Sequence, residues 1–224
     1  KNKININKWI FSELLKTKNI VEKNIKNYRF DEAARNVYQF VWHYYCDWYL
    51  ELSKTILYSN DKSAIKEVRE VTGFIFKEIL VLMHPFIPFV TEEIWLKNKL
   101  DNSGKNYLMY SNWIKGKIKK DNDHKEVEKV IDIISKIRSF KNELNVSPGS
   151  FIDVSLVKIN NKNKSFFKDN EIIFKKLGRI NNFFNEESDK SSASLVIGGD
   201  LFKIYFEENV DLNLIKENLI NKQR

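Results

Sequence analysis

The sequence WHYYCDWYLEL, at positions 42–52, constrains the fold of this chain more than any other feature. It contains two Trp, three Tyr and one Cys within eleven positions, interrupted by one Asp and one Glu. The surrounding apolar positions recur at helical spacing, which predicts an α-helix that is apolar on more than one side. Such a helix is expected at the centre of a helix bundle, where neighbouring helices cover it from several directions.

At about 100° per residue, the ring-rich helix has one predicted core face and one narrow polar strip. The predicted core face consists of Ala34, Val37, Tyr38, Val41, Tyr44, Tyr45, Trp48 and Leu52, extended on one flank by Trp42, Cys46 and Tyr49. The polar strip consists of Asn36, His43, Asp47 and Lys54, with Glu51 at its border and Leu50 beside it. We therefore expect the aromatic rings to pack in the core rather than to stack on bases. The strip either forms internal hydrogen bonds or faces a ligand.

Four helices with short connections are predicted in the first half of the chain. They span residues 7–28, 31–58, 64–83 and 88–100. Asp31 is the expected N-cap of the second helix, and Pro88 suits the first turn of the fourth. Short connections between long helices favour an antiparallel bundle.

The second half has a different character. Residues 106–113 look extended, 115–123 form a charged connector, and a helix is expected over 125–144. Residues 151–159 alternate as a half-buried strand does, and a helix over 165–178 is expected to close at Gly178. Gly198-Gly199-Asp200 supplies the turn of a hairpin. The predicted fold class is mainly α: an antiparallel bundle (1–114), a linker (115–122), a small α+β domain (123–209) and an amphipathic segment (210–224).

Composition narrows the possible partners. The 224 residues carry a net charge of +8, which favours an anionic partner such as nucleic acid, although Lys, Asn and Ile are abundant throughout. The only cysteine, Cys46, cannot form an internal disulfide and is expected in the core, in a reducing compartment. No apolar run approaches the roughly 18–20 residues of a membrane span, and no signal peptide is evident.

Several stretches carry a family resemblance. YRFDEAARNVYQFVWHYYCDWYLELSK, followed by HPFIPFVTEEIW, closely resembles the anticodon-binding helical bundle of valyl-tRNA synthetase. KIRSFKNELNVSPG and VIGGDLFKIYF look like the segments that follow that bundle, so the resemblance covers about residues 8–208. HPFIPFVTEEIW is shared with the isoleucyl and leucyl enzymes, whereas CDWYLE indicates the valyl branch. One departure is Thr55, where the family usually has Pro, so the helix can continue towards Tyr58.

The resemblance implies a C-terminal fragment without catalytic activity. The ATP-site motifs of class I synthetases are absent, as are GxGxxG, GxxxxGK[ST], HExxH and CxxC, and the three His are too scattered to form a ligand set. The family's main anticodon-reading helix is expected just before Lys1. The parent enzyme would join valine to its tRNA in the cytoplasm with ATP and magnesium. This fragment would bind tRNA, with no cofactor or metal of its own, no membrane contact and no implied protein partner.

The resemblance places the turn around Leu50 and Glu51 near the anticodon loop, where Glu51 could accept from base amino groups and Leu50 could pack on a base. Lys54, one turn further on, is an electrostatic hypothesis for a phosphate contact. Three alternatives stay open: an isoleucyl or leucyl anticodon domain, a helical scaffold that binds protein, and a hydrolase using Asp47 and Glu51. An exposed apolar patch on the 31–58 helix would favour the scaffold. Carboxylates four residues apart lie side by side and cannot flank a substrate, which argues against the hydrolase.

Overall fold

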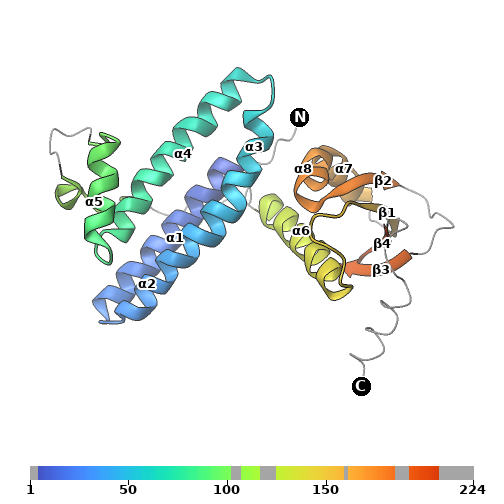
Figure 1. The fold of residues 1–224 in the computed structure, drawn as a ribbon, viewed down its shortest axis with the longest axis horizontal. Helices are drawn as coiled ribbons and strands as arrows, with labels where there is room; N and C mark the ends of the chain where they lie inside the picture. Colours follow the sequence, from blue (N-terminus) through green and yellow to red (C-terminus); the bar gives the residue numbers. More distant parts are fainter. Residues whose placement is uncertain (1–4, 102–106, 117–124, 159–160, 185–191, 207–224) are drawn as a thin grey trace. The chain divides into compact units, whose positions relative to one another are not determined.

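The computed structural model of the chain describes residues 5–101, 107–116, 125–158, 161–184 and 192–206. These residues form two compact units, Asn5–Lys125 and the part that begins at Glu126 (Figure 1). Positions 117–122 of the predicted linker and the amphipathic segment 210–224 lie outside the described residues.

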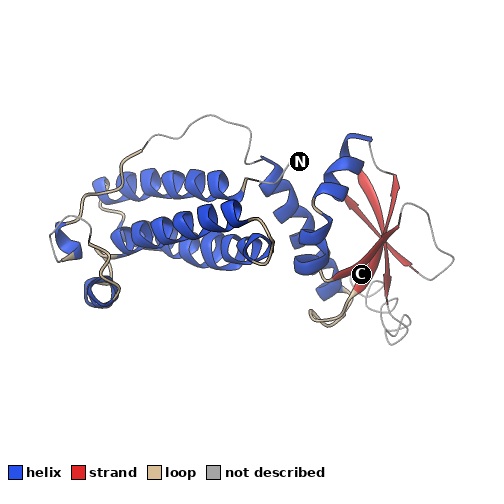
Figure 2. Cartoon of the chain, turned by 90° about the horizontal axis from the view of Figure 1, so that it is seen from above, coloured by secondary structure: helices blue, strands red, loops and turns tan. Residues whose placement is uncertain are grey.

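The first unit is helical and corresponds to the predicted bundle. Figure 2 shows its long helices lying side by side. Its elements are α1 (Ile6–Lys26), α2 (Phe30–Gln39), the π-helix η1 (Phe40–Leu50), α3 (Glu51–Leu57), α4 (Lys62–Met83), α5 (Pro88–Lys97) and the short 3₁₀ turn η2 (Leu108–Tyr110). The four predicted helices are thus present. The expectation of an extended segment over 106–113 is wrong at 108–110, because η2 forms there.

Local chemistry explains where these helices begin. The Asp61 side chain accepts from the backbone N–H of Ala64 and caps α4, and Pro88 occupies the first turn of α5. The predicted cap at Asp31 is wrong, since α2 begins at Phe30 and Arg29 holds the N-cap position. Tyr28 has a φ of 58°, and the chain turns there between α1 and α2. The second helix consequently begins at Phe30, one residue before the predicted start at Asp31.

The ring-rich helix is one continuous rod over residues 30–57, but its middle is not α-helical. Eleven residues, Phe40–Leu50, form i→i+5 hydrogen bonds, so each turn of this segment holds more residues than an α-helical turn. The absence of proline at position 55 has the predicted effect: α3 continues to Leu57, and the Thr55 hydroxyl donates to the Leu52 carbonyl (2.7 Å).

The buried side of this rod is held to α1 and α4 by its tyrosines. The Tyr49 hydroxyl donates to Asn7 Oδ1 of α1 (3.0 Å), and the Tyr45 hydroxyl donates to the Thr72 carbonyl of α4 (3.4 Å). Their rings stack at a centroid distance of 5.8 Å. Burial raises the pKa of Tyr45 to about 12 and also raises that of Tyr49.

The second unit is a small α+β fold, as predicted. It consists of α6 (Lys125–Glu143), β1 (Ile152–Lys158), α7 (Asn161–Asp169), α8 (Glu171–Gly178), β2 (Ile180–Phe184), β3 (Ser192–Ile197) and β4 (Asp200–Phe206). The sheet order is β2-β1-β4-β3; β1 and β2 pair in parallel, and the other pairs are antiparallel. The helices of this unit lie along one side of the sheet (Figure 2).

Three details of the second unit differ from the sequence prediction. The single helix expected over 165–178 is split at Asn170, whose side-chain amide donates back to the Phe166 carbonyl (2.9 Å). Strand β2 was not predicted. The residue that leaves the helical conformation after α8 is Arg179, with a φ of 54°, and not Gly178. The predicted hairpin is confirmed, with Gly198 and Gly199 at positive φ between β3 and β4.

Candidate nucleic-acid interface

The π-helical segment changes which residues of the rod share a face. Buried positions advance at α-helical spacing through Ala33, Val37 and Phe40, and then step by five residues to Tyr45. After that step the buried set continues with Trp48, Tyr49, Leu52 and Ser53. A fixed rotation of about 100° per residue does not follow this path, because the i→i+5 turns lag behind it.

The prediction that the aromatic rings all pack in the core is therefore wrong for two of them. Tyr38 is 64% exposed and Trp42 is 59% exposed, and their rings lie parallel to each other at a centroid distance of 6.3 Å. The prediction holds for Trp48 and Tyr45, which are buried. Ala34, Val41, Tyr44 and Cys46 are of intermediate exposure.

The polar strip lies mostly on the surface, as expected. His43, Asp47 and Lys54 are exposed, and His43 Nδ1 lies 3.9 Å from Asp47 Oδ2. Asn36 is half-buried, and its side-chain amide donates to the Glu32 carbonyl one turn earlier (2.7 Å). Asn36 therefore fits the interpretation of the strip as internal hydrogen bonds. His43, Asp47 and Lys54 fit the interpretation of the strip as a face that is open to a ligand.

The three predicted site residues lie at the junction of η1 and α3. Leu50 is the last residue of η1 and is half-buried, while Glu51 is the first residue of α3. Lys54 Nζ forms an ion pair with Glu51 Oε1, and both side chains are partly exposed. The ion pair uses one oxygen of the Glu51 carboxylate, Oε1. Whether RNA touches these residues stays a prediction.

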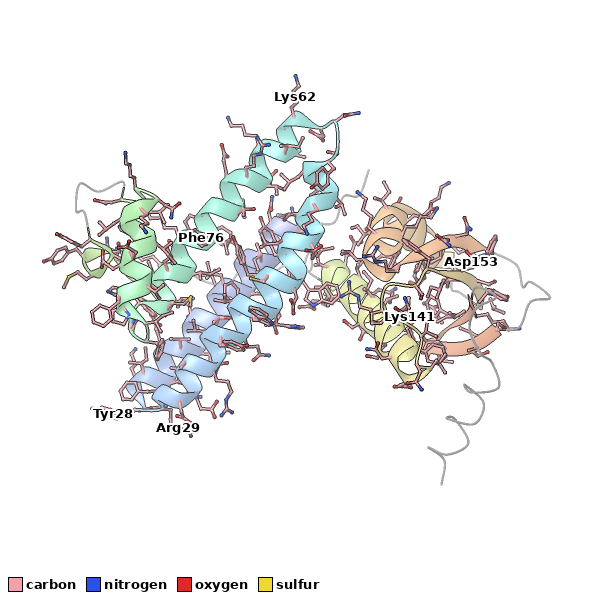
Figure 3. All side chains as sticks on the ribbon, in the orientation of Figure 1. Tyr28, Arg29, Lys62, Phe76, Lys141 and Asp153 are labelled. Carbon is pink, nitrogen blue, oxygen red and sulfur yellow. The ribbon has the colours of Figure 1, made fainter. Side chains whose placement is uncertain are left out.

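A row of cations on α4 was missed in the sequence. Lys62, Lys66 and Arg69 recur at i, i+4 and i+7, so they share one side of the first half of α4, and all three are exposed. Lys62 is labelled near the start of that helix in Figure 3. The row follows α3 directly across the turn at 58–61, and α3 packs against α4. The i, i+4, i+7 spacing of these three residues in the sequence already indicates a cationic side of this helix. One acid lies close: Glu70 Oε1 is 3.9 Å from Lys66 Nζ.

Two other stretches that carry the family resemblance serve the fold itself. In HPFIPFVTEEIW, His84 Nδ1 hydrogen-bonds with the Thr91 hydroxyl (2.9 Å), and the Glu92 carboxylate accepts from the Leu108 backbone N–H (2.7 Å). These contacts attach α5 to the end of α4 and to η2. His84 is thus a structural residue.

In KIRSFKNELNVSPG, two cations bind backbone carbonyls. The Arg138 guanidinium donates to the Leu177 carbonyl (2.8 Å and 3.1 Å), near the end of α8. Lys141 is only 2% exposed, and its ammonium donates to the carbonyls of Ser150 and Pro148. Burial, with Arg179 and Arg138 nearby, lowers the pKa of Lys141. These side chains stabilise the second unit and are not available to a ligand.

Within the described ranges, no three His, Cys, Asp or Glu side chains gather as metal ligands would. None of the helices in that part of the chain combines the length and apolar content of a membrane-spanning segment. Among the described residues of the first unit, the exposed side of the α2–η1–α3 rod and the cationic row on α4 are two surface features that can engage a ligand.

An up-and-down helical unit that exposes aromatic, amide and charged side chains along one rod suits an unstacked nucleic-acid loop. Comparison with known families agrees: residues 7–156 match the family described as "Anticodon-binding domain of tRNA ligase". The chain belongs to this family. The matched region includes the whole rod, and also α6 and most of β1 in the second unit.

The similar proteins carry a more specific name. The chain is 63% identical over 220 residues to the valine–tRNA ligase of Pelagibacter ubique, which covers 98% of this chain and 25% of that protein. It is 34% identical to the valine–tRNA ligase of Rhizobium meliloti (87% of this chain, 21% of that protein) and 31% identical to that of Bartonella quintana (98% and 24%). The chain thus spans about a quarter of the length of these curated relatives.

Proposed function

We propose that this chain binds the anticodon end of a valine tRNA through the exposed side of the α2–η1–α3 rod. The observation that carries the proposal is the match of residues 7–156 to the anticodon-binding family, together with 63% identity to a valine–tRNA ligase. Unstacked bases of an RNA loop are read by hydrogen bonds to their edges and by packing on their planes. Glu51 supplies an acceptor for amino groups, and Leu50 supplies an apolar surface.

Phosphates would be bound by cations next to these two residues. Lys54 is held by Glu51 in the free chain, and an exposed pair of this kind is worth only about 0.2–1 kcal/mol, so a phosphate can compete for the ammonium. When Lys54 turns to a phosphate, the Glu51 carboxylate becomes free to accept from a base. Lys62, Lys66 and Arg69 extend the cationic surface along α4.

In this proposal the chemistry belongs to the longer polypeptides that the relatives represent. There, valine is joined to its tRNA at the expense of ATP with magnesium, in the cytoplasm, and this chain contributes RNA binding alone. It needs neither ATP nor magnesium to bind. ATP–pyrophosphate exchange by the chain itself would contradict this division of roles.

The direct experiment titrates the full 224-residue chain with labelled valine tRNA at several salt concentrations. Each phosphate that is neutralised should contribute a slope of about −0.7 to −0.9 in log K against log salt. Lys54→Gln should make this slope shallower by the contribution of about one phosphate contact. Glu51→Gln should weaken binding to valine tRNA more than binding to a tRNA with a changed anticodon.

A matched control exists on α5, where Lys97 and Glu93 form an exposed pair one turn apart (2.9 Å). Lys97→Gln and Glu93→Gln should leave the affinity unchanged. Salt-insensitive binding, or no binding to any tRNA, would contradict the proposed function. Equal loss on both tRNAs from Glu51→Gln would remove its role in base recognition and leave tRNA binding intact.

A further inference from the structure

The rod ends in an aromatic ring that the core does not use. Tyr58 follows α3 directly, and its side chain is 78% exposed. Its backbone N–H donates to the Lys54 carbonyl (3.1 Å), which is the bond that one more residue of an α-helix would form. The helical spacing of α3 therefore also gives the side of the helix on which Tyr58 lies.

Tyr58 lies in line with two residues of the candidate site. Glu51, Lys54 and Tyr58 are separated by three and four residues, so they form one stripe along α3. At 1.5 Å per residue the stripe is about 10 Å long. We call these three residues the α3 stripe. It brings a carboxylate, an ammonium and an aromatic plane to one side of the first unit.

Two cations without a counter-charge follow the α3 stripe. The turn after Tyr58 is polar, and within it the Asp61 backbone N–H donates to the Ser59 hydroxyl oxygen (3.3 Å). Lys62 then begins α4, and Arg69 lies about two turns further on. Both cations are exposed, and neither forms an ion pair in the part of the chain that the structure describes. A phosphate beside Tyr58 can therefore bind Lys62 without displacing an acid.

The acids of this region each have a partner within the chain. They are Asp61, which accepts from the Ala64 N–H (3.0 Å), Glu67, which accepts from the Asn7 amide (2.8 Å), and Glu51 and Glu70, which pair with Lys54 and Lys66. Positions 51–70 thus hold four acids and four cations, so charge alone attracts RNA weakly here. An aromatic plane adds a contact that needs no net charge.

We propose that Tyr58 stacks on an unstacked base of the bound RNA loop and that Lys62 binds the phosphate next to this base. The inference rests on the proposed function, because it adds a base contact to the same surface. An exposed ring beside cationic side chains is typical of a surface that binds single-stranded RNA, since every base offers a face for stacking. A protein partner fits less well, because the turn at 59–62 places no apolar residue beside the ring.

The first measurement titrates labelled valine tRNA with the full 224-residue chain and with three variants of Tyr58. Tyr58→Ala should weaken binding by about tenfold or more, which is the usual effect of removing a stacked ring. Tyr58→Phe keeps the ring and should bind as the unchanged chain does, whereas Tyr58→Leu should bind nearly as weakly as Tyr58→Ala. The slope of log K against log salt should be the same in all three, since none changes a charge, and Lys62→Gln should make it shallower.

Tyr28 provides a matched control. Its side chain is 81% exposed, and Figure 3 shows it at the opposite end of the first unit from Lys62. Tyr28→Ala should leave the affinity for valine tRNA unchanged. The unchanged chain is also treated with tetranitromethane, and nitration of each tyrosine is followed by mass spectrometry. Saturating tRNA should slow the nitration of Tyr58 several-fold and leave that of Tyr28 as it was, which a purely structural role of Tyr58 would not produce.

Several results would overturn the inference while the proposed function stands. They are tRNA binding that ignores Tyr58→Ala, nitration of Tyr58 that tRNA does not slow, and binding by Tyr58→Leu as tight as that of the unchanged chain. An equal loss in Tyr58→Phe and Tyr58→Ala would assign the contact to the hydroxyl and not to stacking. A dimer that dissociates on Tyr58→Ala would assign the ring to a protein contact. If the unchanged chain bound no tRNA, the inference and the proposed function would both be contradicted.

Discussion

The ring-rich rod of the first unit and α6 of the second unit invert the usual relation between polarity and burial. The rod leaves Trp42 59% exposed, whereas α6 buries Lys141 to 2% exposure. In the rod, the π-helical turns move Trp42 away from the core that its spacing predicts. In α6, two carbonyls of the 148–150 turn provide acceptors that hold a buried ammonium.

This difference shows that backbone geometry and local partners decide burial when they conflict with hydropathy. Within one π-helical segment, Trp48 is buried and Trp42 is exposed, so position on the rod decides burial for two residues of the same type. A lysine enters the core where backbone oxygens accept its hydrogen bonds. Substitutions of Trp42 in the first unit and of Lys141 in the second should therefore have effects unlike those typical of a tryptophan and a lysine.

The largest expected effect is the loss of a buried ring from the rod. Trp48→Ala should lower the free energy of unfolding of the first unit by about 3–5 kcal/mol, because Trp48 is buried and its removal leaves a cavity. Urea unfolding followed by tryptophan fluorescence reports on this unit alone, since all five tryptophans lie before residue 125. If Trp48→Ala lowered the free energy of unfolding by less than about 1 kcal/mol, as surface substitutions do, the assignment of Trp48 to the buried face of the rod would be contradicted.

A smaller loss is expected from Lys141→Met. The substitution keeps the apolar stem of the side chain but leaves the Ser150 and Pro148 carbonyls without their donor, which should cost about 1–3 kcal/mol in the second unit. Hydrogen exchange of the β1 and β4 amides measures this. Lys136→Met, at an exposed position on the same helix, is the control and should have little effect. An unchanged exchange rate in Lys141→Met would mean that the ammonium is not needed by the turn.

Alkaline pH should affect the two units in opposite directions. Burial raises the pKa of Tyr45 from 10.0 to about 12. The protonated hydroxyl therefore contributes fully to the stability of the first unit below pH 10, and this contribution is lost as the pH rises through 12. Burial lowers the pKa of Lys141 from 10.5, so the unfolded chain binds more protons just below that pH and the second unit gains stability there. Fluorescence and hydrogen exchange across this range separate the units.

Tyr45→Phe should reduce the alkaline loss in the first unit, and Lys141→Met should abolish the gain in the second. Tyr49, whose pKa is also raised by burial, should leave a residual slope in the first variant. Parallel pH profiles for the two units would contradict the assignment of these groups.

The smallest expected effect is that of Trp42→Ala on stability. Because this ring lies on the surface, the free energy of unfolding should change by no more than about 0.5 kcal/mol. The comparison with Trp48→Ala, six residues away on the same rod, is the sharpest contrast that the chain offers. A loss of several kcal/mol would place Trp42 in the core after all.

Much of the fold is predictable because its signals are local. Pro88 in the first turn of α5, the spacing of apolar residues in α4, and Gly198-Gly199 in the hairpin each act on their own neighbours. Strand β2 is not predictable in this way, since INNFF is short, its apolar residues do not alternate with polar ones, and it is stabilised by pairing with β1. The π-helical turns also carry no compositional mark, so a fixed helical period does not follow the step from Phe40 to Tyr45 in the buried face.

The candidate site is predictable in part. The exposure of His43, Asp47 and Lys54 follows from the polar strip, and the ion pair of Glu51 with Lys54 follows from their spacing. The roles of Leu50 and Glu51 towards RNA stay predictions, because they depend on a ligand that neither spacing nor packing contains. The exposure of the Tyr38–Trp42 ring pair required the structure, since their residue types match those of the core face.

Hydroxyl-radical footprinting with mass spectrometry tests directly, on the folded chain, whether the rod has one buried and one exposed aromatic face. Tyr38 and Trp42 should be oxidised rapidly, while Trp48 and Tyr49 should be protected until the chain unfolds. Equal protection of Trp42 and Trp48 in the monomeric chain would contradict the assignment of one exposed and one buried face to this rod.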